Sequence, residues 1–250
     1  MTGDDFFLYL SKSEDGGETW ADTLVSSGSW ASGSCLAVSA QDPQTVYILA
    51  SEMPGYILSR STDGGQTWST THFGDGMSIS FLEADPAHPG RLFGGLAYDG
   101  LVRSDDGGQT WTRVLDTDVG VLRFNPSSPG EVFVSSAYFD PGVWFSWDGG
   151  TSWGPVGTGL PTAPFRQVLS LDLDPSGDTL YVGTDGGGAW AVDLTVPGDL
   201  DLSGRIDIVD LVILDLMMAG QATAGRRADL NGDGRLTPDD RDALRSRLGQ

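Results

Sequence analysis

A phrase that recurs four times, a second marker in the same phase and a change of side-chain spacing near residue 198 together predict the fold class. The protein is expected to be mainly β: a partial β-propeller of about four to five blades, followed by a small α-helical domain with two EF-hand-like calcium loops. We expect the propeller over residues 1–193, a linker at 194–197 and the C-terminal domain over 198–250. The 36 glycines and the low share of charged residues, 20%, favour many tight turns over long helices.

The chain is strongly acidic, with 14 Lys and Arg against 35 Asp and Glu and a formal net charge of -21. Nearly all of this charge lies in the propeller part, because residues 198–250 carry only -3. Nucleic acids and anionic membranes would be repelled, so neither is expected as a partner. No run of about 18 apolar residues could span a bilayer. Cys35 is the one cysteine and cannot form an internal disulfide.

The repeated phrase has the form Ser-x-Asp-Gly-Gly-x-Thr-Trp. Its copies are Ser13–Trp20 (SEDGGETW), Ser61–Trp68 (STDGGQTW), Ser104–Trp111 (SDDGGQTW) and Ser146–Trp153 (SWDGGTSW). The Asp positions 15, 63, 106 and 148 are separated by 48, 43 and 42 residues. This period fits one four-stranded propeller blade and is too long for a ladder of hairpins.

The second marker is an Asp-Pro or Asn-Pro turn that ends an apolar stretch in each repeat. It occurs at Asp42-Pro43, Asp85-Pro86, Asn125-Pro126 and Asp174-Pro175. The phase predicts about 17 strands: two before residue 26, four in each of three repeats and three in the last. Thr184–Gly187 (TDGG) is out of phase and is expected in a hairpin between the second and third strands of the last repeat.

The first repeat lacks its first two strands. We interpret the chain as starting inside a blade, as the C-terminal part of a longer propeller would. Closure by four blades is the alternative, and it would leave one strand spare.

The phrase resembles the Asp-box, or BNR repeat, of sialidases, sortilin-type receptors, xyloglucan hydrolases and photosystem assembly factors. In those families the box joins the third and fourth strands of a blade, on the face away from the ligand. The resemblance therefore implies a structural role for the four aspartates of the phrase. The chemistry agrees, because the carboxylate and hydroxyls can bond nearby backbone, the glycines allow positive φ and the Trp can pack under the turn.

Any ligand site is expected on the opposite face, in the loops that join strands two to three and four to one. These loops hold aromatic side chains that could stack on a sugar and acids that could bond its hydroxyls. The candidate ligand-binding residues are Tyr56, Tyr98, Asp99, Tyr138, Asp140 and Asp185. The alternative is ordinary turn chemistry, since hairpins use Asp-Gly and Pro-Gly.

Glycoside hydrolysis would require two facing carboxylates, at roughly 5 to 9.5 Å. Glu52, Asp99, Asp118, Asp140 and Asp185 are available, and the sequence does not pair them. By that resemblance, a sialidase would carry an arginine triad and an Arg-Ile-Pro motif near its start. The propeller part has only six arginines and lacks that motif, which disfavours sialidase activity. The sequence argues less strongly against a neutral-glycan hydrolase similar to xyloglucanases than against a sialidase. It does not identify catalytic residues. His72 and His88 have no cysteine partner, so no zinc site is expected.

The strongest chemical signal is a duplicated twelve-residue loop, 199–210 and 229–240. Calcium prefers six to eight oxygen ligands, supplied by side chains at loop positions 1, 3, 5, 9 and 12 and by a backbone carbonyl at position 7, with Gly at position 6 for the sharp turn. The predicted ligands are Asp199, Asp201, Ser203, Arg205, Asp207 and Asp210 in the first loop and Asp229, Asn231, Asp233, Arg235, Thr237 and Asp240 in the second, with Arg205 and Arg235 acting through their carbonyls. The sequence therefore predicts two Ca²⁺ ions.

Each loop ends in Asp where an EF-hand has Glu, and no long helix is expected before it. Paired loops of this kind, each followed by a helix (210–218 and 238–248), resemble a type I dockerin. That resemblance implies a cohesin-domain partner, bound through the helices and through loop positions 10 and 11. Those positions are Ile208-Val209 and Pro238-Asp239, which differ from the familiar Ser/Thr pairs and from each other.

Two readings of the apolar run 211–218 stay open, a core face or a contact surface. Because so small a domain depends on its calcium, we expect chelation to unfold residues 198–250 and to leave the propeller folded.

The leading functional hypothesis is a secreted or cell-surface modular protein. In it, a propeller that binds a ligand or serves as a scaffold is attached by a calcium-dependent dockerin to a cohesin-bearing partner, in polysaccharide processing. The alternatives are a glycoside hydrolase of xyloglucanase or sialidase-like type, or an inactive fragment of one. The first five residues lack the pattern of a signal peptide.

Overall fold

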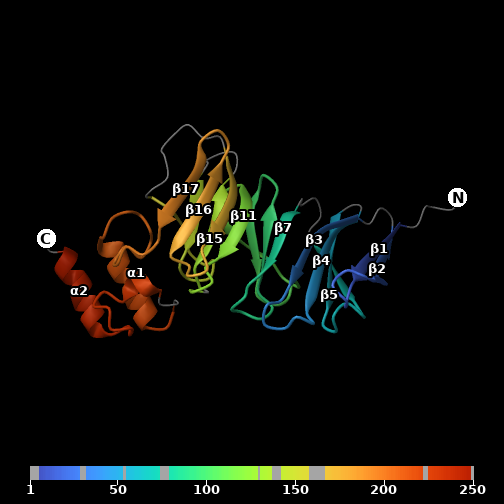
Figure 1. The fold of residues 1–250 in the computed structure, drawn as a ribbon, viewed down its shortest axis with the longest axis horizontal. Coiled ribbons are helices and arrows are strands. Elements are labelled where there is room, and N and C mark those ends of the chain that lie inside the picture. The colour runs from blue at the N-terminus through green and yellow to red at the C-terminus, as the bar shows by residue number, and fades with distance from the viewer. Residues whose placement is uncertain are drawn as a thin grey trace. The chain divides into compact units, whose positions relative to one another are not determined.

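The protein is described by a computed structural model over residues 6–28, 32–52, 55–73, 79–128, 130–136, 142–157, 167–221 and 225–248. These residues form 17 strands, two α-helices and one short 3-10 helix. The strands lie in five sheets (Figure 1), divided in chain order into two, four, four, four and three strands, as the sequence predicts. The chain divides into two compact units, Met1–Arg113 and Val114–Gln250.

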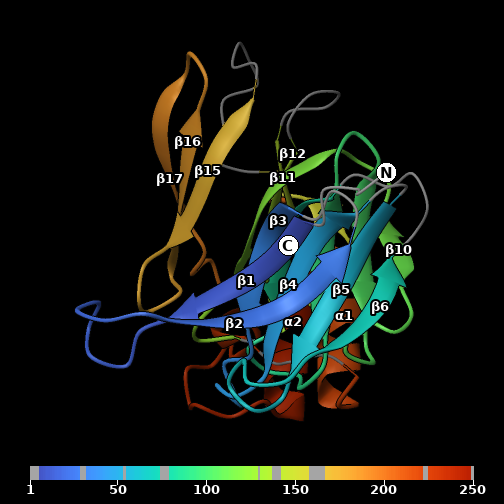
Figure 2. The ribbon, with the colours of Figure 1, turned by 90° about the vertical axis from the view of Figure 1, so that its right-hand side faces the viewer.

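The first unit contains three sheets whose strands follow one another in chain order (Figure 2). The strands are β1 (Phe6–Lys12) and β2 (Ala21–Gly28); β3 (Ser32–Val38), β4 (Val46–Glu52), β5 (Gly55–Ser61) and β6 (Ser69–Phe73); and β7 (Ile79–Ala84), β8 (Leu92–Leu96), β9 (Gly100–Ser104) and β10 (Thr112–Leu115). The unit boundary falls within β10. Tyr47, Leu49 and Leu58 of the second sheet pack against Leu82 and Leu92 of the third, and this contact forms the core of the unit.

The second unit begins with two more sheets. These are β11 (Val119–Phe124), β12 (Val132–Ser136), β13 (Gly142–Ser146) and β14 (Gly154–Pro155), then β15 (Val168–Leu173), β16 (Thr179–Thr184) and β17 (Gly188–Asp193). The out-of-phase TDGG begins at the last residue of β16 and forms the turn to β17, as predicted. Every residue of β12 is buried, which explains why this strand reads as an uninterrupted apolar and small-residue run. Phe133, Phe145, Leu171 and Leu180 form the centre of the shared core.

The segment after β17 packs against the propeller sheets of the second unit. Leu194 is buried in the same core, and its amide donates to the Asp178 carbonyl at 2.8 Å. The chain then forms helix α1 (Ile208–Met218), the 3-10 helix η1 (Arg226–Ala228) and helix α2 (Pro238–Leu248). Ile213, Leu214 and Leu244 lie at the centre of a second core that joins α1 to α2. Among the described residues, no helix has the length and apolar character to cross a membrane.

Each copy of the repeated phrase forms the same hydrogen-bonded turn. In the third copy the Ser104 hydroxyl donates to Asp106 Oδ1 and accepts from the Gly108 amide, both at 2.8 Å. Asp106 also accepts from the Thr110 amide at 2.9 Å and from its hydroxyl at 2.6 Å. The indole of Trp111 donates to the Gly108 carbonyl at 3.0 Å. The serine, aspartate and tryptophan bonds recur in the other three copies, so these side chains are used within the turn.

The Asp-Pro and Asn-Pro turns share a phase with the phrase because the two are bonded to each other. The first phrase glycine donates its amide to the stretch after the proline turn in three repeats: Gly64 to Gln44, Gly107 to Gly90 and Gly149 to Gly130, at 2.8 to 2.9 Å. Both markers therefore lie at the same end of each of the three four-stranded sheets. This end of the blade is fixed by local hydrogen bonds.

Candidate functional site

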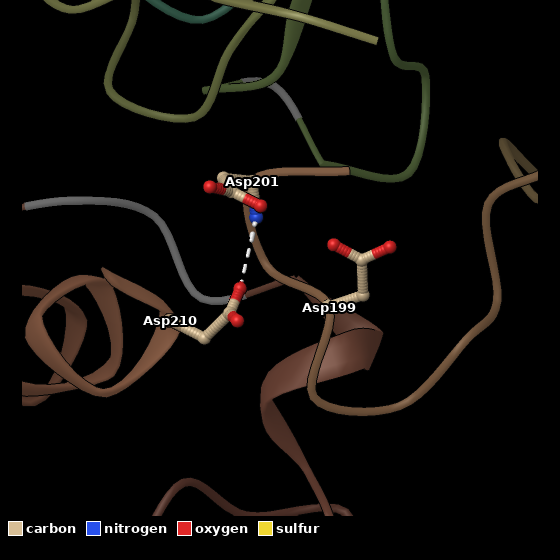
Figure 3. Close-up of side chains that lie close together, drawn as sticks. All are labelled: Asp199, Asp201 and Asp210. Carbon is tan, nitrogen blue, oxygen red and sulfur yellow. Dashed lines mark hydrogen bonds between the residues drawn. The ribbon is translucent and has the colours of Figure 1, made fainter. Parts of the chain in front are cut away.

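The first predicted calcium loop brings three carboxylates together. One oxygen from each of Asp199, Asp201 and Asp210 lies within 4.8 Å of the others (Figure 3). Asp199 and Asp201 come from the start of the loop, and Asp210 comes from the first turn of α1. This set of oxygen ligands on a tight loop is the chemistry that Ca²⁺ prefers.

Asp210 fixes the geometry of this loop. Its Oδ1 accepts from the backbone amides of Leu200 at 2.7 Å and Asp201 at 3.3 Å, which returns the loop end to the loop start. Its Oδ2 accepts from the Asp207 amide at 2.7 Å, while Asp207 caps α1 through the Val209 amide at 2.8 Å. The reciprocal pair is a capping box, so the loop and the helix form as one element.

The Asp199 carboxylate lies in an environment that a bound cation would stabilise. Its carboxylate is buried, and Oδ1 has no hydrogen-bond partner among the described residues, whereas Oδ2 accepts from the Gly204 amide at 2.9 Å. Burial raises the pKa of Asp199 to about 6, helped by the neighbouring charges of Asp210 and Asp201. A buried carboxylate oxygen without a donor is costly. A divalent cation would satisfy it, so the residues of this loop fit Ca²⁺.

The second loop repeats the hydrogen bonds of the first. Asp240 Oδ1 accepts from the amides of Leu230 at 2.9 Å and Asn231 at 3.2 Å, and its Oδ2 accepts from the Thr237 amide at 2.8 Å. Asp229 Oδ2 accepts from the Gly234 amide at 2.8 Å, as Asp199 accepts from Gly204.

The surroundings of the two loops differ. Burial would raise the pKa of Asp240, but the amide bonds outweigh it and the pKa is lowered. The loop segment 231–235 is exposed. Loop position 5 also differs, since it is a hydroxyl in the first loop and a carboxylate in the second. The Ser203 hydroxyl accepts from the Arg205 amide at 3.4 Å, and the Asp233 carboxylate accepts from the Arg235 amide at 2.9 Å.

Helix α1 divides the predicted apolar run between two faces. Leu211, Ile213, Leu214 and Met217 are buried in the domain core, whereas Val212 is 54% exposed. Ile208 and Val209, at loop positions 10 and 11, are 64% and 44% exposed and lie at the start of the same helix. Most of the run therefore belongs to the core. Its exposed Val212 joins Ile208 and Val209, which precede the run, in an exposed apolar face that we call the α1 face (Ile208, Val209 and Val212).

The equivalent positions of the second repeat have different chemistry. Pro238, Asp239 and Asp242 are exposed at the start of α2. They offer one ring and two carboxylates where the first repeat offers three aliphatic side chains. The two helices are tied to each other by the Arg241 guanidinium, which donates to Asp215 of α1 through Nη2 at 2.8 Å. The duplicated loops thus present two unequal surfaces.

The described propeller candidates are Tyr56, Tyr98 and Asp99 in the first unit and Asp185 in the second. Asp99 is held by Arg113, whose Nη1 and Nη2 donate to the carboxylate at 3.0 and 2.7 Å. These bonds lower the pKa of Asp99. Tyr98 is exposed with a positive φ of 63°, and Tyr56 packs at the rim of the first core. Asp185 is exposed in the β16–β17 turn.

Other sequence candidates lie outside the described part of the chain. Tyr138 and Asp140 fall in the segment 137–141, which is not described, and the Glu52 side chain is not described either.

The remaining candidates are described. Asp118 is buried in the second unit. His88 Nδ1 lies 2.9 Å from the Asp85 carboxylate, a turn contact, and His72 is exposed on β6.

Sequence reasoning missed a cavity in the first unit. It has a volume of about 320 Å³ and is lined by Leu10, Lys12, Glu14, Thr19, Trp20, Ala21, Thr23 and Gly64–Gln66. Trp20 is 63% exposed there, whereas the equivalent Trp68 and Trp111 are partly buried. Among the described residues of the first unit, the predicted ligand-binding residues Tyr56, Tyr98 and Asp99 do not line this cavity. No sequence signal distinguished Trp20 from its equivalents.

Known proteins resemble both the C-terminal domain and the β-sheet part of this chain. Residues 197–249 match the family described as Dockerin type I domain. Among solved structures, the GH74 enzyme of Niastella koreensis is 22% identical with a TM-score of 0.52, covering 64% of this chain and 28% of its own. The GH74 xyloglucanase from Xanthomonas campestris is 19% identical with a TM-score of 0.51, covering 65% and 29%. YCF48 bound to D1 peptide is 23% identical with a TM-score of 0.54, covering 74% and 58%.

None of the curated proteins matches this chain. The chain spans between 28% and 58% of the length of these three solved structures, and the likeness shows the fold. The prediction of a mainly β protein with a β-propeller followed by a C-terminal dockerin is confirmed. Type I dockerin domains bind calcium and cohesin domains, which supports Ca²⁺ as a ligand and a cohesin as a partner.

Proposed function

We propose that this chain is a secreted or cell-surface modular protein in which a β-propeller is attached to a cohesin-bearing partner through a calcium-dependent dockerin. The observation that carries the proposal is the C-terminal domain match, together with the three-carboxylate cluster in its first loop. The propeller then acts as the cargo that the dockerin attaches. Its process is polysaccharide breakdown, by analogy with the GH74 enzymes whose fold it shares.

Two calcium ions are proposed, one in each loop. The first ion would be held by Asp199, Asp201, Ser203, Asp207, Asp210 and the Arg205 carbonyl, and the second by Asp229, Asn231, Asp233, Thr237, Asp240 and the Arg235 carbonyl. Support comes from the equivalent bonds of Asp210 and Asp240, which close both loops in the same way. The proposed boundaries are 1–193 for the propeller, 194–197 for the linker and 198–250 for the dockerin.

The α1 face is the proposed cohesin-binding surface. Ile208, Val209 and Val212 together expose aliphatic side chains on one side of the domain. Their burial on association is a favourable term, because apolar contact contributes roughly 25 cal/mol per Å² removed from water. The acidic positions of the second repeat would have to lose solvent around two carboxylates. A cohesin should therefore bind in one orientation, through the first repeat.

The test is calorimetric titration of the full chain with a type I cohesin from the same source, in calcium. Binding of the unmodified chain and its loss in Ile208→Asp would support the proposal. An Asp242→Ala chain is the matched control, since it changes the equivalent surface of the second repeat. If both variants bind as the unmodified chain does, the α1 face is not the contact, and if no cohesin binds, the attachment function is wrong.

The propeller is proposed to bind a polysaccharide through the loops that hold Tyr56, Tyr98, Asp99, Tyr138, Asp140 and Asp185. The second candidate function is glycoside hydrolysis, which the fold shared with GH74 enzymes favours. An assay with a soluble xyloglucan distinguishes polysaccharide binding from hydrolysis. Retention without turnover supports a binding module. Turnover that is lost in Asp99→Ala or Asp140→Ala supports the hydrolase.

A further inference from the structure

A buried ion pair links the C-terminal domain to the propeller sheets within the second unit. Arg227, in the 3-10 helix η1, donates from Nη2 to Glu131 Oε1 at 2.6 Å, and both side chains are only 4% exposed. Glu131 lies directly before β12, 96 residues earlier in the chain. Its other oxygen, Oε2, accepts from the Asn125 amide group at 2.8 Å. Each oxygen of this buried carboxylate therefore has a donor, and one of the two donors comes from the C-terminal domain.

The arginine is held on several sides. Its guanidinium lies 5.0 Å from the ring centroid of Phe145, a buried core residue of β13. Nη1 points at the Leu194 carbonyl at 3.4 Å, and the Arg227 carbonyl accepts from the Gly198 amide at 3.0 Å. Next to it, Arg226 forms an ion pair with Asp178 at 2.8 Å, in the turn that opens β16. The segment before the second loop is thus tied to both sheets of the unit.

The first calcium loop makes a separate contact with the same sheets. Leu202, at loop position 4, is buried in the propeller core formed by β12 to β17. Its carbonyl accepts from the Gly157 amide, just after β14, at 2.8 Å. Leu202 has a positive φ of 58°, which a leucine adopts only where its surroundings impose it. The Asp201 amide before it and the Ser203 amide after it are held by Asp210 and Asp201, two of the predicted calcium ligands.

One side chain also belongs to both cores. Trp147, directly after β13, packs against the propeller core and against the core of the helical domain. The sheet β15–β17 ends without a fourth strand in the described residues, and its last strand continues into the buried Leu194. The C-terminal domain therefore supplies packing and charge pairing to this sheet.

We propose that calcium binding in the loop 199–210 stabilises the sheets β11–β14 and β15–β17, so that these sheets and the C-terminal domain unfold as one cooperative unit. A ligand that binds only the folded state stabilises everything that must fold with its site. Calcium fixes the loop that places Leu202, and the domain places Arg227 against Glu131. Loss of the ion would free both contacts and leave Glu131 buried with one donor fewer. This replaces the expectation that chelation leaves the whole propeller folded.

The test is hydrogen–deuterium exchange of the full chain in calcium and in EGTA. We expect chelation to speed exchange at least tenfold in 199–248 and also in β12, β16 and β17, while β4, β5 and β8 of the first unit keep their rates. Faster exchange confined to 199–248 would overturn the coupling. Unchanged exchange everywhere, including 199–210, would instead show that the loop binds no calcium, which separates failure of the metal site from failure of the coupling.

Two charge-matched variants sharpen the test. Arg227→Met removes the buried cation, and Arg245→Met removes an exposed one from α2. In Arg227→Met we expect calcium to protect the loop 199–210 while its protection of β16 and β17 falls at least tenfold. Arg245→Met should behave as the unmodified chain does. Equal protection of β16 and β17 in both variants would contradict the role of the ion pair, and the exchange of the unmodified chain decides the coupling even if Arg227→Met does not fold.

Discussion

The Cδ2 atom of Leu58 lies 1.9 Å from the point that a Cβ atom on Gly108 would occupy. Leu58 is on β5, and Gly108 is the second glycine of the third repeated phrase, so a leucine of one sheet fills the space left by the glycine of the next turn. Leu10 and Gly65 repeat the relationship one sheet earlier, with a distance of 2.6 Å. The double glycine is thus required both for its positive φ and for the packing of neighbouring sheets.

Gly108→Ala should lower the stability of the first unit more than Gly17→Ala does. The φ angles of Gly108 and Gly17 are +89° and +97°, so both variants carry the left-handed strain of about 1 to 2 kcal/mol. Only Gly108 adds a clash with Leu58, for which overpacking costs typically about 1 to 3 kcal/mol. At Gly17 the nearest atom is from Trp20, at 3.9 Å. Denaturant unfolding followed by tryptophan fluorescence measures the difference, and equal losses would show that the leucine gives way freely.

Asp106 of the third phrase should make the propeller sensitive to acid between about pH 4 and pH 2. Hydrogen bonds from the Thr110 hydroxyl and amide and from the Ser104 hydroxyl lower the pKa of Asp106 to about 2. The pKa of a free aspartate is about 3.9. A lowered folded-state pKa contributes stability that is present above the unfolded value and is lost as pH falls through the folded value. Stability should therefore decline across this window.

Asp106→Asn is the variant that checks this acid dependence. It should be less stable than the unmodified chain at pH 7 and should lose less further stability between pH 4 and pH 2. Glu18→Gln, at an exposed position of the first phrase, removes one negative charge and serves as the control. Parallel curves for Asp106→Asn and the unmodified chain would show that the carboxylate is not the titrating source.

Calcium titration of the chelator-treated chain should show two bound ions. Asp199→Asn and Asp229→Asn each replace the first ligand of one loop by a neutral side chain of the same shape. Each should weaken one site by about tenfold or more and leave the other intact, because calcium affinity depends on ligand charge. Asp116→Asn, in the propeller part, is the control. A single bound ion in the unmodified chain would show that one of the two loops does not bind calcium.

The exposed aliphatic face of α1 leads to a prediction about partner binding. Val212→Asp should abolish or strongly weaken cohesin binding, since it places a charge where apolar contact is proposed. Val212 is 54% exposed, so the change should leave calcium binding and folding intact. Circular dichroism and calcium titration of the same variant check this. Retained cohesin binding by Val212→Asp would direct the search to the acidic start of α2.

The repeats were predictable because their chemistry is local. The bonds of the third phrase join Ser104 to Asp106 and Asp106 to Thr110, within four residues of each other, so spacing alone carries the structure. The same holds for the calcium loop, which closes between Leu200 and Asp210. Strand number and sheet division followed from these fixed points.

The contacts between distant segments were not predictable. Nothing in the segment 225–228 indicates that Arg227 pairs with a glutamate 96 residues earlier. Leu194 looked like part of a linker because it precedes Val196-Pro197, yet it is buried in the core. Leu202 was a spacer between calcium ligands in the sequence and is a core residue in the structure. Such contacts depend on tertiary packing, which periodicity and spacing do not encode.

The proposed function requires that the dockerin attach this propeller to a partner only in the presence of calcium. The most direct measurement is cohesin binding by the full chain as free calcium is raised from EGTA-buffered to millimolar levels. We expect no binding in EGTA and an affinity that rises in step with calcium occupancy of the loops. Binding of equal strength with and without calcium, or none at saturating calcium, would contradict it.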